Sequence, residues 1–252
     1  MPFKADNTTR FVTHWPRGIA YAELVSGGLV GTGGPVVSPS VAGLGLRTVS
    51  ASSQYAVKAT SALGTLGGSD PYTIASAFVP SNTSTRGTLV SLGSISTEIP
   101  YVWLEINATS GKASFNTRPD GGGGEILVTS NSFTAGQLCT AVAVNYGAAS
   151  RKVVLNGQIA SAGSGTTSYS GQTFSLTRTG VGALTRTTAI VFFDGWSLIQ
   201  VIEARAWSDA EIQAFAENPW RRFAARRPLV PVSAGGGSTS LTVNETTHAH
   251  SA

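Results

Sequence analysis

Short runs of β-branched, aromatic and aliphatic residues recur along most of this 252-residue chain, separated by segments rich in Gly, Ser and Asn. Glycine supplies positive φ angles and Pro and Asp start tight turns, so the separating segments have the composition of turns. Many short strands without helical segments between them are typical of an antiparallel sandwich or barrel. The predicted strands cover residues 43–49, 54–60, 72–79, 87–93, 101–107, 112–118, 125–130, 137–146, 151–157, 173–178 and 189–207.

One segment, at about residues 208–217, has the pattern of a short α-helix. Ser208 and Glu211 have the spacing of a capping box, in which each side chain bonds the other's backbone amide, and Pro219 ends the helix. About two and a half turns are too few to be stable alone in water, so we expect the helix to dock on the sandwich. The apolar residues expected at that contact are Trp207, Ile212, Phe215 and Trp220.

The composition excludes several classes of protein. Charged residues make up only 12% of the chain and hydrophobic residues 41%, which allows a sizeable core and argues against disorder. No apolar run approaches the roughly 20 residues that cross a bilayer, and the first residues lack the apolar stretch of a secretory signal. We therefore expect no membrane partner. The single cysteine, Cys139, cannot form an internal disulfide and is interpreted as a small buried hydrophobe.

Basic residues gather in one short segment near the C-terminus. The formal net charge is +4, and four arginines fall within the sequence WRRFAARRP: Arg221, Arg222, Arg226 and Arg227. Nucleic-acid binding needs a broad basic surface or a known motif, and the chain shows neither. We therefore expect no nucleic-acid partner and interpret the cluster as a site that docks a neighbouring protein.

The character of the chain changes after Pro228, where a Pro segment and a Gly/Ser linker lead into LTVNETTHAHSA. We expect residues 228–252 to be either disordered or an extended arm on a partner's surface. They follow a main domain at 40–227, and residues 1–39 are expected to supply an N-terminal segment and the first strands. His248 and His250 would point the same way on a strand, so a trimer could bring six imidazoles to one metal ion; the alternative is two solvated histidines.

The order of motifs from about residue 40 to 223 resembles a laminin-G-like domain of the concanavalin-A-like lectin/glucanase superfamily. The similar segments are AGLGLRTVSASSQYAVKATSALG, PYTIASAFVPSNTSTRGTLVSLGS, TAVAVNYGAASRKVVLNGQIAS and IVFFDGWSLIQVIEARAWSDAEIQAFAENPW. The third looks like a family hairpin with Asn156–Gly157 at its tight turn. The last is most similar to laminin-G-like domains of bacteriophage and prophage virion proteins. The resemblance implies a jelly roll of two packed antiparallel sheets.

Catalytic patterns are missing from the sequence. Glycoside hydrolases of this superfamily carry paired carboxylates as Glu-x-Asp-x-x-Glu on one strand. Here Glu105 is followed two places later by Asn107, and Glu203 by Arg205. No serine nucleophile motif or phosphate-binding loop stands in a suitable context.

The turn acids Asp70, Asp120 and Asp194 form no visible cluster of the converging oxygens that hard cations need. We expect no cofactor and no metal in the main domain.

One strand face has the residues of a sugar-binding surface. Tyr101, Trp103 and Glu105 alternate along one predicted strand and so share a face. Asn116 and Arg118 join them if the next strand pairs as a hairpin. Aromatic rings with polar neighbours suit the apolar CH surfaces and hydroxyl rims of pyranoses. The alternative is that both aromatic residues fill a sheet face covered by a loop or neighbour.

The sequence favours a non-enzymatic bacteriophage virion structural or decoration protein, assembled in the host cytoplasm. It would dock to other virion subunits (capsid, tail or fibre) as a homo-oligomer. A glycan-binding adhesin on the same particle is the alternative, and a glycoside hydrolase is less favoured.

Overall fold

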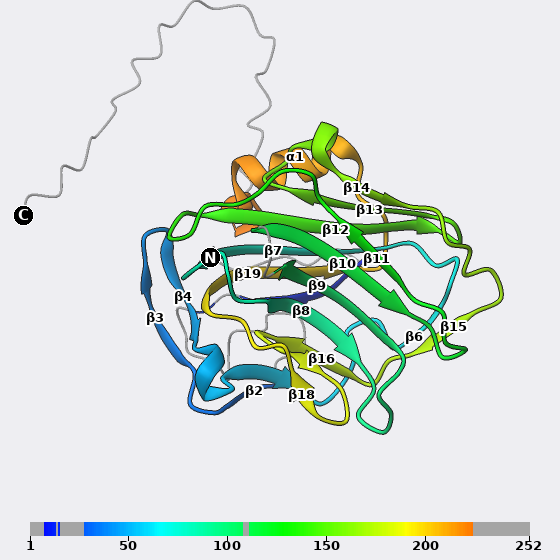
Figure 1. The fold of residues 1–252 in the computed structure, drawn as a ribbon, viewed down its shortest axis with the longest axis horizontal. Coiled ribbons are helices and arrows are strands. Elements are labelled where there is room, and N and C mark those ends of the chain that lie inside the picture. Colours follow the sequence, from blue (N-terminus) through cyan, green and yellow to red (C-terminus); the bar gives the residue numbers. More distant parts are fainter. Residues whose placement is uncertain (1–7, 14, 16–27, 108–110, 224–252) are drawn as a thin grey trace, which may run out of the picture.

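The structure of the chain is a computed structural model that describes residues 8–13, 15, 28–107 and 111–223. Two large antiparallel sheets pack face to face, and one short helix covers the outer side of one sheet (Figure 1). The expected fold class, an all-β two-sheet jelly roll with a short C-terminal helix, is confirmed.

The larger sheet has eight strands. Its order is β14-β13-β12-β7-β19-β4-β3, with β1 added alongside β19. In chain order these strands are β1 (Thr9–Val12), β3 (Val36–Ser40), β4 (Gly43–Thr48), β7 (Tyr72–Pro80), β12 (Cys139–Gly147), β13 (Ser150–Leu155), β14 (Gly163–Gly165) and β19 (Gly195–Glu203).

The other large sheet has seven strands in the order β11-β10-β9-β8-β16-β5-β2. In chain order they are β2 (Leu29–Thr32), β5 (Tyr55–Lys58), β8 (Gly87–Gly93), β9 (Tyr101–Asn107), β10 (Lys112–Arg118), β11 (Glu125–Val128) and β16 (Arg178–Val181). Strands β1, β2 and β3 come from the N-terminal segment, so residues before 40 contribute to both sheets.

Smaller elements connect these strands. They are the strands β6 (Thr65–Gly67), β15 (Thr173–Ser175), β17 (Leu184–Thr185) and β18 (Ala189–Ile190), and the 3-10 turns η3 (Ser50–Ser52), η4 (Ile159–Ser161) and η5 (Pro219–Phe223). Strand β15 pairs with β6, and β17 pairs with β18.

The main core lies between the two sheets. Alternating residues of each strand point into it, as in Val102, Leu104 and Ile106 of β9, all of which are buried. Phe78 of the larger sheet makes edge-to-face contacts with Phe133 and Phe193, a favourable aromatic geometry. Every residue of β7 is buried because both sides of the larger sheet are covered.

The helix α1 (Asp209–Glu217) covers the outer side of the larger sheet, above β12 and β13 in Figure 1. Both halves of the predicted capping box with Ser208 are present. Ile212, Phe215 and Trp207 are buried in a second apolar cluster on the sheet's outer side, and Trp220 packs against it. The predicted docked helix is therefore confirmed. Beyond Asn218 the chain turns into η5.

Three local predictions need correction. The segment 189–207 is two strands, since β18 ends where Val191 takes a positive φ of 55°, and β19 begins only at Gly195. Similarly, 173–178 splits between β15 and the first residue of β16, which lie in different sheets. Asn156–Gly157 is not the tight turn between β12 and β13. It follows β13 as a left-handed pair, with φ of 52° and 68°.

No helix in the described part of the chain is both long and apolar enough to cross a membrane.

Candidate functional site

The register of β9 and β10 brings the five predicted sugar-site residues onto one side of the seven-stranded sheet. Arg118 pairs with Tyr101, Asn116 with Trp103, and Ser114 with Glu105. Paired residues in an antiparallel ladder point to the same side, and the residues between them face the core. The side that carries Tyr101, Trp103, Glu105, Asn116 and Arg118, turned away from the core, is called the outer face below.

The aromatic residues of the outer face form a stack with two arginines. The Tyr101 and Trp103 rings lie 5.0 Å apart at an interplanar angle of 12°. The Arg86 guanidinium lies 5.4 Å from the centre of the Trp103 ring, and that of Arg186 lies 5.8 Å from the Tyr101 ring. Both distances suit cation–π attraction, so each aromatic ring has an arginine neighbour as well as an aromatic one.

Each of these arginines is held by a carboxylate. Arg86 donates from Nε and Nη2 to the two oxygens of Glu105, at 2.8 and 3.1 Å, and Arg186 Nη2 lies 2.9 Å from Glu98. Asn116 Nδ2 donates to Glu105 Oε1 at 2.9 Å. The Glu105 side chain is 1% exposed. Burial raises the pKa of Glu105, and the bonds from Arg86 and Asn116 offset this only in part.

Burial divides the predicted residues into two groups. Trp103 and Asn116 are 6% and 2% exposed, so with Glu105 they lie beneath the surface. Tyr101 is half-buried, Arg118 is exposed, and the Arg86 side chain is 45% exposed to solvent. A ligand on this face therefore meets Arg86, Tyr101 and Arg118, and the buried Glu105 and Trp103 hold the first two in place.

Sequence reasoning missed Arg86 and Arg186. Arg86 precedes β8 in a segment with the composition of a turn, and Arg186 lies between β17 and β18. Neither belongs to a strand whose alternation could place it, so no sequence pattern assigned either to this face.

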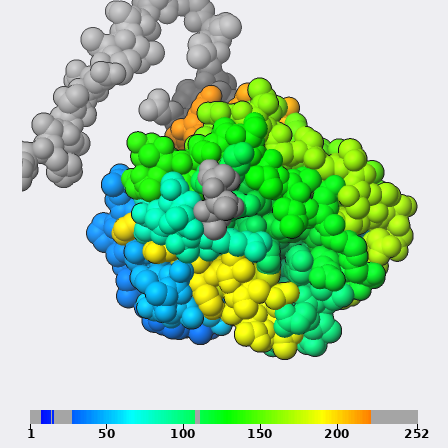
Figure 2. Space-filling model, viewed as in Figure 1, coloured from blue at the N-terminus to red at the C-terminus, as the bar shows by residue number. Residues whose placement is uncertain are grey.

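The hairpin of β17 and β18 covers part of the outer face. Ser91 of β8 donates from Oγ to the carbonyl of Ala183 at 2.8 Å and accepts from the Thr185 amide at 3.2 Å. A Cβ on Gly93 would lie 2.2 Å from the carbonyl oxygen of Thr185, so only glycine allows this close approach. In Figure 2 the hairpin belongs to the yellow surface beside the teal and green strands. Since the middle of β9 and β10 is buried as well, the uncovered part of the face lies at the end of these strands that carries Tyr101 and Arg118, and over β11, whose Ile126 and Val128 are exposed.

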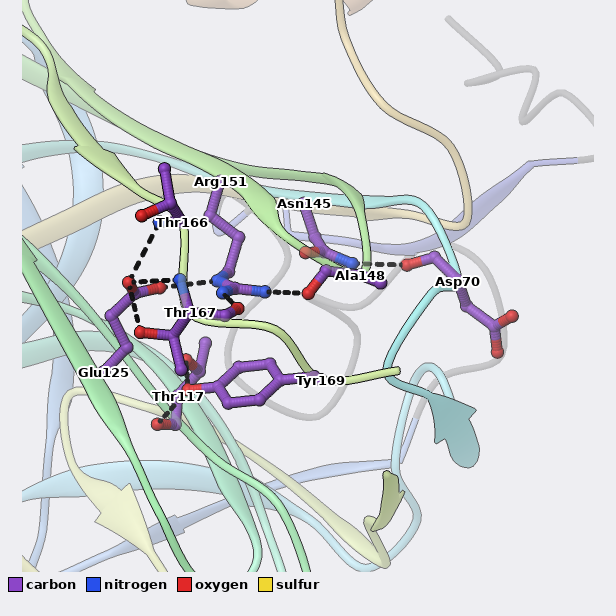
Figure 3. A network of polar contacts seen from close by, with 9 residues as sticks. All are labelled: Asp70, Thr117, Glu125, Asn145, Ala148, Arg151, Thr166, Thr167 and Tyr169. Carbon is purple, nitrogen blue, oxygen red and sulfur yellow. Dashed lines mark hydrogen bonds and ion pairs between the residues drawn. The ribbon is translucent and has the colours of Figure 1, made fainter. Parts of the chain in front are cut away.

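A second polar cluster, the Arg151 network, joins β11 and β13 (Figure 3). The fully buried Arg151 side chain donates from Nε to Glu125 at 2.8 Å and from Nη2 to the Thr167 carbonyl. Its guanidinium lies 4.1 Å from the centre of the Tyr169 ring, and the Tyr169 hydroxyl bonds Thr117. These bonds connect both large sheets to residues 166–169.

The Glu125 carboxylate of this network accepts from the Thr166 and Thr167 amides and from the Thr167 hydroxyl. Burial acts to raise the pKa of Glu125, but the bonds from Thr167 and Arg151 outweigh it and leave the pKa lowered. The charged groups therefore satisfy one another, and the network is interpreted as a structural connection between the sheets.

The other predicted groups lie elsewhere. Arg221 is exposed within η5, while the Arg222 side chain and the whole of Arg226, Arg227, His248 and His250 lie outside the described residues.

The turn acids are engaged locally: Asp70 accepts from the Gly67 amide, Asp120 from Ser175, and Asp194 pairs with Arg47. Within the described ranges no group of three or more His, Cys, Asp or Glu residues is placed to hold a metal. Burial raises the pKa of the Cys139 thiol to about 11.

Comparisons with known proteins show the fold. No protein-family model and no curated protein sequence matches the chain. Domain 4 of AbnA, a GH43 extracellular arabinanase from Geobacillus stearothermophilus solved with arabinotriose, is similar with a TM-score of 0.63 at 13% identity. The match covers 83% of this chain and 98% of that domain.

Two further structures are similar. The binding domain of botulinum neurotoxin serotype G has a TM-score of 0.56 at 10% identity, over 83% of this chain and 50% of that one. The Ruminococcus gnavus IT-sialidase CBM40 has a TM-score of 0.50 at 15% identity, over 58% of this chain and 83% of that one. At these identities the likeness defines the class of fold, an all-β jelly-roll sandwich consistent with the concanavalin-A-like fold.

Proposed function

We propose that this protein is a non-catalytic saccharide-binding domain that uses the uncovered part of its outer face. The observation that carries the proposal is the Tyr101–Trp103 stack fixed between two carboxylate-anchored arginines, with the exposed Arg118 beside it. Tyr101 offers an apolar ring edge and a hydroxyl, and Arg86 and Arg118 offer hydrogen-bond donors. Groups already held in place bind a ligand with little loss of side-chain entropy.

Structures of similar fold support this choice among functions. The arabinanase domain was solved in complex with arabinotriose, and the CBM40 domain belongs to a sialidase. Both are associated with proteins that act on sugars, which favours the glycan-binding alternative over a purely structural role.

The arrangement of the acids favours binding over hydrolysis. On the outer face, Glu105 is buried and bonded on both oxygens. Glu203 and Glu211 come close to one another only by sharing Arg205, at 3.0 and 2.7 Å. Glu203 is buried and Glu211 belongs to the helix cap, so neither suits the paired-carboxylate roles of a glycosidase.

A role in virion assembly stays a prediction, because most of its proposed docking elements lie in residues 224–252, outside the described part. Homo-oligomerisation and location in a virion likewise rest on the resemblance in sequence. A saccharide-binding domain is compatible with the adhesin alternative on such a particle.

A glycan array probed with the full chain tests the proposal. We expect binding to at least one class of glycan, reduced about tenfold by Tyr101→Ala or Arg118→Gln, each of which removes a surface contact. The matched control is Arg10→Gln, an exposed arginine on β1 of the other sheet. A folded protein that binds no glycan, or whose binding is unaffected by both face variants, would overturn the proposal.

A further inference from the structure

We propose that the saccharide bound by the outer face is acidic, and that its carboxylate group pairs with Arg118. This inference rests on the proposed function, since it names the chemical class of the ligand for the same face.

The outer face has an excess of positive charge. Its described side chains include five cations, and two carboxylates accompany them, which leaves a net charge of +3. The cations are Arg86, Arg118, Arg178, Arg186 and Lys112, and the carboxylates are Glu98 and Glu105. Such a local excess attracts anions and strengthens where part of the surface is shielded from water.

Two of the arginines form ion pairs within the protein. Arg86 and Arg186 are bound to Glu105 and Glu98, so the protein itself neutralises them. Arg118 and Arg178 have no ion-pair partner among the described residues. Arg178 makes only a long contact of 3.4 Å, from Nη1 to the carbonyl of Arg186, and Arg118 is exposed. Arg178 is only partly exposed beside the hairpin of β17 and β18, so Arg118 is the arginine whose donors face a ligand.

These two arginines lie on the same cross-strand row as Tyr101. Arg178 pairs with Gly93, Gly93 with Tyr101, and Tyr101 with Arg118, across strands β16, β8, β9 and β10. Three strand spacings of about 4.8 Å put the Arg118 and Arg178 backbones about 14 Å apart. The hairpin of β17 and β18 rests on Gly93, between Arg178 and Tyr101, so a sugar on the uncovered face can contact Tyr101 and Arg118 but not Arg178.

The side-chain type favours carboxylates as the anionic groups. A guanidinium presents parallel N–H groups that match the two oxygens of a carboxylate, and such charge-assisted pairs are stronger than neutral hydrogen bonds. The face already contains this pairing in Arg86 and Glu105, where Nε and Nη2 contact both oxygens. The carboxylate of a uronic or sialic acid unit would form the same two-bonded pair with Arg118.

The test uses an array on which each acidic oligosaccharide is printed beside its carboxyl-reduced counterpart, which differs only in that group. We expect the full chain to bind the acidic member about tenfold more strongly, because charged hydrogen bonds are lost on reduction. Arg118→Gln should remove most of this preference, whereas Arg178→Gln, beyond the hairpin of β17 and β18, should have little effect. Arg10→Gln removes the same charge on the other sheet and should leave the preference unchanged.

The outcomes separate this inference from the proposed function. Equal binding of both members of each pair would leave the saccharide site standing and overturn the acidic preference. Absence of binding to every glycan would overturn both. Equally tight binding of a short oligodeoxythymidine, abolished by Arg118→Gln, would show a general polyanion surface and also overturn the inference.

Discussion

Glu105 of β9 has both carboxylate oxygens bonded to Arg86, at 2.8 and 3.1 Å, although its side chain is 1% exposed. The buried carboxylate thus fixes a partly exposed guanidinium over the Trp103 ring.

Glu105→Gln should show how pH acts through this pair. Burial raises the pKa of Glu105 in the folded state, so its contribution to stability is fully present below the unfolded pKa of about 4.3 and is lost as pH rises through the folded pKa. The free energy of unfolding of the natural protein, relative to Glu105→Gln, should therefore fall from about pH 4 to pH 7. Urea unfolding across this range measures the difference, and a difference that grows with pH would contradict the assignment.

Glu125→Gln should show the opposite dependence. The pKa of Glu125 is lowered, so its stabilisation is present above the unfolded pKa and lost as pH falls through the folded pKa. At pH 7 the variant leaves the buried Arg151 charge unpaired, which should cost about 3 kcal/mol in free energy of unfolding. The destabilisation caused by Glu125→Gln should become smaller at acidic pH, where Glu125 of the natural protein is itself protonated. Exposed Glu217→Gln is the control, and a similar small effect of both variants would exclude a stabilising Arg151 network.

Gly93→Ala should displace the hairpin of β17 and β18. The added methyl group would lie 2.2 Å from the carbonyl oxygen of Thr185, so the hairpin has to move and carry Arg186 with it. Overpacking of this kind typically costs about 1–3 kcal/mol, measured here as a lower midpoint of urea unfolding. Gly123→Ala, with open space around its Cβ, should have little effect. Unchanged stability of Gly93→Ala would mean that the hairpin does not rest on the sheet.

Deletion of residues 228–252 tests the predicted C-terminal arm. The described strands and helices end at Phe223, so the shortened chain should keep the unfolding midpoint of the full chain. If the arm docks neighbouring subunits, the shortened chain should also lose self-association in analytical ultracentrifugation. A shortened chain that assembles like the full chain would exclude the arm as the docking element.

Local patterns in the sequence determined the strand face of the candidate site and the position of the helix. Alternation along residues 101–107 and 112–118 placed the predicted sugar-site residues on one sheet face, because successive side chains in a strand point to opposite sides. The helix at 209–217 followed from Ser208 and Glu211, three residues apart, because a capping box is completed within one turn.

Only the tertiary structure decided which of those residues reach the surface and which groups complete the site. Arg86 meets Glu105 across 19 positions of sequence, and Arg186 meets Glu98 across 88. Such pairs depend on how strands are ordered in the sheet and how the hairpin of β17 and β18 folds back, and neither leaves a periodic pattern in the chain. The burial of Trp103 could not be predicted for the same reason, since Arg86, which lies over its ring, comes from the segment before the neighbouring strand β8.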